Sequence, residues 1–448
     1  MSAYKNERIG LAESLVAYGR KRGVSDLEVS IQEGTEFRAS IQDQKMDNLT
    51  ESVFKTLDLR VYDGNKLARA SSSDFTLETL HRLVDNAIAR ARLGGEDPFG
   101  GLPELEPIQA KAESLGIHDP AILELAPERK ISYAKEAEAI GLKDKRIKKS
   151  LGATFNSYTW STLLVNSRGF SGGYERTLLS GFVGFQCGEG DNLFQEYWYD
   201  STTQLADLKP AEYLAKTAVE RATRLIGGRK VETQNVPVVT DPSTSEGILR
   251  FVAQCVSGAS VARRQSFLAD KLGSRIGNER VNIVDDGLLV GGRGTIPFDS
   301  EGVPCRRTPV VENGVLKNYL TDTYWGRKLK LPSTGNAGGL RNLYWAAGTS
   351  SPEEIIRSVD KGLYLTGTIG LGTEATTGDL SVGAFGLWIE KGELTYPVAG
   401  ITVAANLGTL LENVEMVGND LELRRPVSAP TIKFAEVTVG GKEKAEKS

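Results

Sequence analysis

The sequence is poor in the side chains that most often carry nucleophilic or metal chemistry. Its 448 residues include only two histidines and three cysteines. Cys187, Cys255 and Cys305 lie far apart and form no CxxC pair, which predicts reduced thiols. Both histidines, His81 and His118, precede residue 120. This short supply argues against a histidine-based zinc site in the chain.

Long hydrophobic runs are also missing, because no stretch of 18 consecutive apolar residues occurs. Residues 394–411 carry no charge, but Thr395, Pro397, Gly400 and Asn406 interrupt them. The segment therefore predicts a buried strand and turn and not a membrane span. Charged residues interrupt the first 23 positions early, which argues against a signal peptide. We expect a cytoplasmic protein without a membrane partner.

The charge balance excludes a strong pull towards polyanions. The net charge is −4 and the isoelectric point about 5.7, so no nucleic-acid partner is predicted. One basic run covers residues 143–149, but Asp144 interrupts it and no aromatic residue is interleaved. Such a run is typical of a solvated helix end.

What the sequence does contain is the composition of a folded α+β protein, with 40% hydrophobic residues, 25% charged residues and 49 glycines. Apolar periodicity predicts helices over 7–22, 76–93 and 127–142, and a further helix after Pro210. Alternating antiparallel strands are expected between the helices, and β-structure dominates after residue 236.

We expect an N-terminal α+β domain over residues 1–95 and a middle α+β region over 96–235. A C-terminal β-rich domain over 236–440 and a frayed tail over 441–448 follow. The middle region repeats the order of elements of the first, which suggests a weak internal duplication.

Four motifs near the C-terminal end carry a family resemblance. Residues 331–339 read LPSTGNAGG, residues 377–379 read TGD, residues 383–390 read GAFGLWIE, and residues 396–398 read YPV. In this order they resemble the signature of the TldD/PmbA family, also called peptidase U62 or the modulator of DNA gyrase family. The match is closest to its PmbA (TldE) type. The resemblance implies a PmbA/TldD-like fold.

One motif of the family is absent. TldD-type chains carry HExxxH on a helix, where two histidines hold Zn²⁺ and the glutamate acts on the metal-bound water. In the corresponding helix of this chain, these positions are assigned to Phe251, Val252 and Val256. All three are apolar, so we expect no metal ligand and no catalytic residue in this chain. The resemblance implies a TldD-like partner subunit that supplies HExxxH and its zinc.

The glycine-rich motifs are the candidates for a substrate cavity, because they expose backbone groups that a peptide strand can pair with. A set of tight β-turns explains the same residues equally well. The candidates are Ser333, Thr334, Asn336, Gly338, Gly372, Thr377 and Asp379. Trp325, Trp345 and Trp388 are expected to anchor a subunit interface.

Two functions of different class follow. The first is the non-metal subunit of a heterodimeric zinc metallopeptidase that cleaves unfolded or leader peptides and small labile proteins. The second is a non-catalytic peptide-binding or assembly homodimer. A self-sufficient hydrolase that uses Cys255 or Cys305 is a third and weaker option, since neither thiol has a histidine signature beside it.

Overall fold

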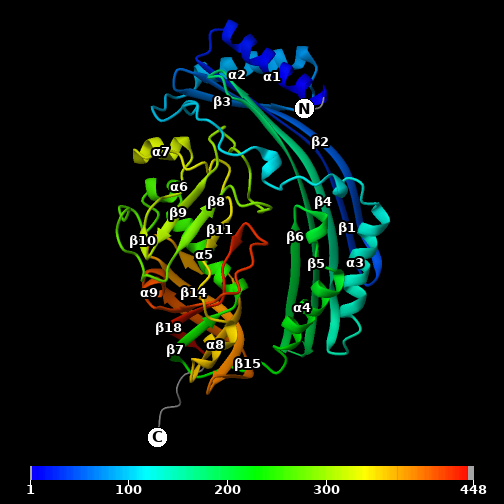
Figure 1. The fold of residues 1–448 in the computed structure, drawn as a ribbon, viewed down its shortest axis with the longest axis vertical. Helices are drawn as coiled ribbons and strands as arrows, with labels where there is room; N and C mark the ends of the chain where they lie inside the picture. Colours follow the sequence, from blue (N-terminus) through cyan, green and yellow to red (C-terminus); the bar gives the residue numbers. More distant parts are fainter. Residues whose placement is uncertain (1–2, 191, 371, 442–448) are drawn as a thin grey trace.

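The computed structural model describes residues 3–190, 192–370 and 372–441. Its N-terminal half is organised around one antiparallel six-stranded sheet of long, curved strands (Figure 1). The strand order is β3 (Lys66–Ser72), β2 (Lys45–Asp63), β1 (Asp26–Gln42), β4 (Ile147–Asn166), β5 (Ser171–Glu189) and β6 (Asn192–Thr202).

Four helices cover one face of this sheet. They are α1 (Ala3–Lys21), α2 (Leu77–Leu93), α3 (Pro127–Gly141) and α4 (Ala211–Thr223). On β1, Leu27, Val29 and Ile31 pack with α1 and α2, while Ile41 packs with α3 and α4. These positions are separated by even numbers of residues, so their side chains leave the strand on the same side. The four helices predicted from periodicity are thereby confirmed.

The six-stranded sheet joins strands from both sides of residue 95. Each half has the order helix, three strands, helix, and the innermost strands β1 and β4 pair from Glu28↔Asn166 to Ile41↔Ala153. The first two predicted regions therefore share one sheet. A duplication as the origin of this arrangement, like the predicted domain boundaries, stays a prediction.

The C-terminal half contains a ring of five strands. β7 (Gln234–Thr240) pairs with β12 (Lys361–Ile369) and β18 (Ile432–Gly440), β18 pairs with β15 (Glu393–Asn406), and β15 pairs with β14 (Asp379–Glu390). The pairing of β14 with β12 closes the ring. β13 (Thr373–Glu374) and β16 (Val414–Val417) attach to β14 and β18. A closed ring leaves few free strand edges.

A second, five-stranded sheet and five helices complete the part of this half that the structure describes. The sheet order is β10 (Val315–Leu316), β9 (Arg307–Glu312), β8 (Ile283–Asp286), β11 (Leu343–Trp345) and β17 (Val427–Ser428). The helices are α5 (Pro242–Val256), α6 (Gly258–Ala262), α7 (Thr323–Leu329), α8 (Pro352–Arg357) and α9 (Leu407–Glu412). The predicted β-rich C-terminal domain and the α+β class are confirmed.

The C-terminal half lies on the concave side of the long sheet (Figure 1). Contacts across this junction include a small apolar core, with Tyr174 against Phe298 at 5.2 Å between ring centroids. Beside it, Arg60 of β2 donates to Glu28 of β1 at 2.6 Å and pairs with Glu301 at 3.1 Å. The sheet face opposite the four helices is thus tied to the C-terminal half by packing and by charge.

Among the described residues, no helix is both long and apolar enough to cross a bilayer. Residues 394–411 were predicted to form a buried strand and turn. The strand is confirmed as most of β15, but the predicted turn is wrong, because residues 407–411 belong to the short helix α9. The predicted tail, residues 441–448, lies outside the described residues except for Gly441.

Candidate functional site

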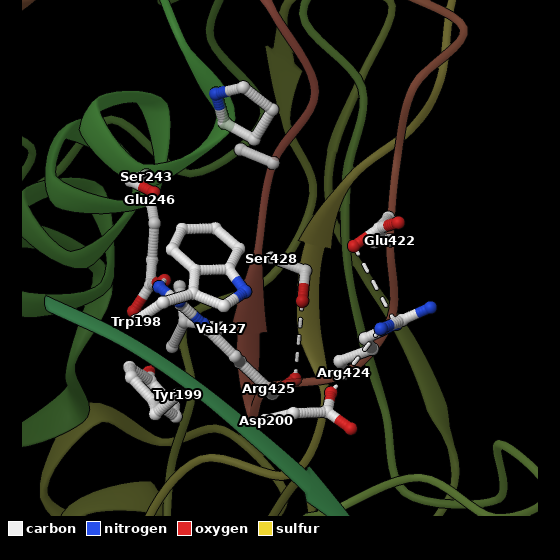
Figure 2. A pocket seen from close by; sticks show the side chains of 12 residues that line it. Trp198, Tyr199, Asp200, Ser243, Glu246, Glu422, Arg424, Arg425, Val427 and Ser428 are labelled. Atoms are coloured by element: carbon white, nitrogen blue, oxygen red, sulfur yellow. Dashed lines mark hydrogen bonds and ion pairs between the residues drawn. The ribbon is translucent and has the colours of Figure 1, made fainter. Parts of the chain in front are cut away.

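A cleft lies between strand β6 of the long sheet and the C-terminal half. Trp198, Tyr199 and Asp200 of β6 form one wall, and the start of α5 with residues 422–429 forms the other. Figure 2 shows Arg425 reaching towards Trp198 and Glu246, and Arg424 lying between Asp200 and Glu422. These groups come from three segments that are far apart in the sequence, so the site exists only in the folded protein.

Helix α5 begins at the edge of the cleft because Asp241 caps its N-terminus. Asp241 follows β7 directly, and its Oδ1 accepts hydrogen bonds from the Thr244 N–H at 2.8 Å and the Thr244 hydroxyl at 2.9 Å. Pro242 occupies the first helical position, where its missing N–H costs nothing. The cap therefore fixes the first turn of α5 at the edge of the cleft.

The second oxygen of the Asp241 carboxylate binds Arg221 of α4, a helix that packs on the long sheet. Arg221 of α4 donates to Asp241 Oδ2 at 2.8 Å, to Glu196 Oε2 at 3.2 Å and to the Thr366 carbonyl at 2.7 Å. Burial raises the pKa of Glu196, and the Arg221 guanidinium opposes this shift. Arg221 thus links α4, β6, α5 and β12 in one buried network.

A second network surrounds Glu246 of α5. Its Oε1 accepts from Arg250 at 2.9 Å and 2.7 Å, and its Oε2 accepts from Arg425 at 2.7 Å. The Arg425 guanidinium also lies 4.0 Å from the centre of the Tyr199 ring and 5.2 Å from that of Trp198. Such cation–π contacts hold a guanidinium against an aromatic wall. We call Glu246, Arg250 and Arg425 the Glu246 trio.

The cleft continues into an apolar cavity of about 330 Å³ at the mouth of the strand ring. Four residues line both spaces, namely Thr244, Gly247, Arg250 and Thr368. Ile248 and Phe251 of α5 and apolar side chains of the ring strands form its walls: Val238, Leu365, Leu380, Val382, Val403, Phe434 and Val437. We call this space the ring cavity.

The three positions assigned to the degenerate zinc motif differ in their surroundings. Phe251 lines the ring cavity, whereas Val252 and Val256 are fully buried in the C-terminal core. The polar side chains that α5 presents at the ring cavity, besides Thr244, are those of Arg250 and Gln254. A guanidinium and an amide beside a phenyl ring do not fit Zn²⁺, which binds imidazole, thiolate and carboxylate.

The remaining candidate ligands and nucleophiles are engaged elsewhere. The His81 ring stacks on Tyr18 with 4.0 Å between centroids, and His118 Nε2 lies 3.9 Å from Glu175. All three cysteines are buried. Burial raises the pKa of Cys255 and of Cys305 to about 12, and it also raises that of Cys187. A thiol with a raised pKa is a poor nucleophile at neutral pH, which argues against a cysteine hydrolase.

The structure separates the predicted substrate contacts. Ser333, Thr334, Asn336 and Gly338 form a compact loop whose polar groups bond within the protein. The Asn336 amide donates to buried Asp285 at 2.6 Å, and the Thr334 hydroxyl accepts from the Thr321 N–H at 2.8 Å. This hydrogen-bonding pattern is typical of a tight turn and not of an open strand edge. A role in substrate binding stays a prediction for these four residues.

The other three candidates lie in the C-terminal ring. Gly372 lines the ring cavity together with Phe251. Thr377 lies in the turn between β13 and β14, and Asp379 is the first residue of β14. The Asn406 amide donates to the Thr377 carbonyl and to Asp379 Oδ1, both at 3.0 Å. Of the predicted set, the ring cavity therefore brings together only Gly372 and Phe251.

Sequence reasoning missed the residues that build the cleft, among them Trp198, Arg221, Glu246, Arg250 and Arg425. One local signal in the sequence is the adjacent pair Arg424–Arg425, which lies outside the predicted helices. The tryptophan prediction was wrong for two of three residues, because Trp345 and Trp388 are 0% and 1% exposed and belong to the core. Trp325 is half-buried and contacts Tyr324 with 4.8 Å between centroids.

Gly247 is expected to weaken α5, and replacing it with alanine should stabilise the protein by about 0.5–1 kcal/mol. Its φ is not positive, and a Cβ built there has no heavy atom within 4 Å. Thermal and urea unfolding of Gly247→Ala would measure the gain. Gly386→Ala is the opposite control, because its Cβ would lie 2.0 Å from the Tyr364 carbonyl oxygen. Equal losses in both variants would contradict the expectation.

Comparison with known proteins places the chain in a family. The PmbA/TldA metallopeptidase models match over residues 27–91 for domain 1, 120–226 for the central domain and 233–441 for the C-terminal domain. The chain belongs to the PmbA/TldD metallopeptidase family.

Particular relatives cover nearly the whole chain. Metalloprotease PmbA of Escherichia coli O157:H7 is 32% identical over 95% of this chain and 94% of its own, and the Haemophilus influenzae homologue is 31% identical over 95% and 94%. A Bacteroides thetaiotaomicron crystal structure described as a modulator of DNA gyrase superposes with a TM-score of 0.91 at 28% identity. It covers 97% of this chain and 99% of its own. TldE from Thermococcus kodakarensis has the same fold, with a TM-score of 0.85 at 22% identity over 96% and 100%.

Proposed function

We propose that this chain is the non-metal subunit of a cytoplasmic TldD/TldE-type zinc metallopeptidase complex. In this heterodimer the partner carries HExxxH, and the present chain forms part of the wall of an enclosed substrate cavity. The substrates are unfolded peptides, leader peptides removed during peptide maturation, and small labile proteins. The names of the relatives, which are metalloproteases of PmbA and TldD type, support this proposal.

One observation carries it. Helix α5 belongs to the metallopeptidase C-terminal domain, yet the side chains at its cavity-facing positions are Thr244, Ile248, Arg250, Phe251 and Gln254. None of these can activate a metal-bound water. This chain's part in the reaction would be to bind, orient and enclose the peptide, with the cleft between β6 and α5 as the place where it does so.

The test compares the pure chain, the HExxxH chain from the same cells, and their mixture. We expect only the mixture to degrade an unstructured peptide, with zinc in the HExxxH chain by elemental mass spectrometry. Replacing the glutamate of HExxxH with glutamine should abolish turnover. Stoichiometric zinc and peptide hydrolysis by the present chain alone would refute the proposal. Recovery of only self-copies in a pull-down from its own cells would favour the peptide-binding homodimer instead.

A further inference from the structure

The ring cavity has the walls of a pocket for an apolar group. Leu365, Val403 and Phe434 of the strand ring face Ile248 and Phe251 of α5 across it. Its volume of about 330 Å³ falls in the range of small-ligand pockets. An apolar group that enters it leaves water for a largely apolar surface, which favours binding through the hydrophobic effect.

The mouth of the ring cavity carries excess positive charge. In the Glu246 trio, one carboxylate is shared by two guanidinium groups, so the trio has a formal net charge of +1. Glu246 is buried, but the Arg250 side chain is 52% exposed and lines both the ring cavity and the cleft. Its contacts to Glu246 use Nε and Nη2. Nη1 takes no part in these contacts, and the Arg250 side chain lines the boundary between the two spaces.

An apolar pocket with an arginine at its mouth is complementary to an apolar group that carries a carboxylate. A peptide supplies this combination at its C-terminus, where the α-carboxylate is attached to the carbon that bears the last side chain. Arginine pairs with carboxylates through charge-assisted hydrogen bonds. Because the cavity and Arg250 are adjacent, both parts of such a residue can be bound at once.

The cleft beyond Arg250 gives room for the residues that precede a peptide's C-terminus. It is lined by Trp198, Tyr199 and the Thr366–Thr368 part of β12, and has a volume of about 270 Å³. β12 is irregular here, since its register against β14 shifts between Leu365 and Gly367. The Thr366 hydroxyl is buried and has no hydrogen-bond partner among the described residues.

We propose that the ring cavity binds the apolar C-terminal side chain of a peptide and that Arg250 pairs with its α-carboxylate. This assignment deepens the proposed function, on which the role of the peptide as substrate or product rests. A fatty acid also combines an apolar group with a carboxylate. It has no amide groups, however, that could bind in the cleft that continues past the Glu246 trio.

Binding to the pure chain tests the proposal without any hydrolysis. The probe is an unstructured N-terminally fluorescein-labelled peptide that ends in leucine, as free acid or as C-terminal amide, followed by fluorescence anisotropy. We expect the acid to bind about tenfold tighter than the amide, or more, which corresponds to about 1.4 kcal/mol. A peptide that ends in aspartate should bind weakly, because a second carboxylate cannot enter the apolar walls.

Two variants separate the two contacts. Arg250→Gln should reduce binding of the acid to the level of the amide, and Gly247→Trp should weaken both peptides tenfold or more by filling the mouth. The matched controls are Arg307→Gln, at an arginine that is 57% exposed and lies outside the lining, and Gly10→Trp, at a helix glycine with open space around it. Both controls should bind like the unmodified chain. Cooperative melting transitions would show that the variants fold.

Equal affinity for acid and amide would overturn the proposal, as would a Gly247→Trp variant that binds normally. Decanoate that displaces the labelled peptide at a lower concentration than the unlabelled peptide does would assign the cavity to a fatty acid. This result would also overturn the proposal. A chain that never forms a complex with an HExxxH subunit would refute the proposed function and leave this binding result intact. An active complex with no preference for the acid would refute this inference alone.

Discussion

Replacing Arg221 with methionine is expected to lower the free energy of unfolding by about 3–5 kcal/mol. The side chain is 11% exposed, and its partners Glu196 and Asp241 are 9% and 4% exposed. Methionine keeps most of the volume but leaves two buried carboxylates without this cation. The cost is therefore mainly that of uncompensated buried charge and not that of a cavity.

The location of Arg221 makes the loss informative. Its helix α4 packs on the long sheet, whereas Asp241 and Thr366 belong to the C-terminal half, so the variant should loosen the junction. Urea unfolding together with limited proteolysis would measure both effects. Lys216→Met on the same helix is the control, since Lys216 is 71% exposed in a surface ion pair with Glu212 and should change stability by about 0.5 kcal/mol or less. A loss below about 1 kcal/mol for Arg221→Met would mean that Arg224, 3.7 Å from Asp241, takes over.

Stability should also depend on pH through Glu28. Burial raises the pKa of Glu28 to about 7 from an ordinary value of 4.5, although Arg60 opposes the shift. Its Oε2 is buried and has no hydrogen-bond partner among the described residues. Between pH 4.5 and 7 the folded protein holds a proton at Glu28 that the unfolded chain releases, so this contribution to stability falls as the pH rises. Below pH 4.5 it is fully present.

Glu28→Gln removes this titration. Relative to the unmodified chain, the variant should gain stability as the pH rises from 4.5 to 7, by at most about 3 kcal/mol. Urea unfolding at a series of pH values would measure the difference. Glu51→Gln, at an exposed position on β2, is the control and should show no such trend. A flat difference for Glu28→Gln would mean that the Arg60 pair keeps Glu28 ionised throughout.

The regular elements could be predicted because periodicity is a local property. The helix predicted over 76–93 is Leu77–Leu93, and the helix predicted over 127–142 is Pro127–Gly141. The family motifs pointed to the fold as a whole. Strand register was beyond reach, because the pairing of β1 with β4 joins positions that are more than a hundred residues apart.

The cleft could not be predicted for a related reason. Its charged groups come from four places in the chain: β6, α4, α5 and the segment around Arg425. Nothing in the local pattern around Glu246 indicates that Arg425, 179 residues later, shares its carboxylate. The glycine-rich motif 331–339 had the opposite problem, because its sequence indicated substrate contacts that the structure does not show. Ser333 and Thr334 stand out in sequence, but the loop uses their hydroxyls to bond the Thr321 backbone.

The position of β18 has a consequence for how the protein folds during translation. This strand, Ile432–Gly440, lies between β7 and β15, and its Ile432 is opposite Thr240, 192 residues earlier. The long sheet can form while the rest is still being translated, since its six strands end at Thr202. The apolar interior of the ring stays open until the last strand has emerged. A nascent chain stalled before residue 432 should therefore be a favoured client of chaperones that bind exposed apolar strands.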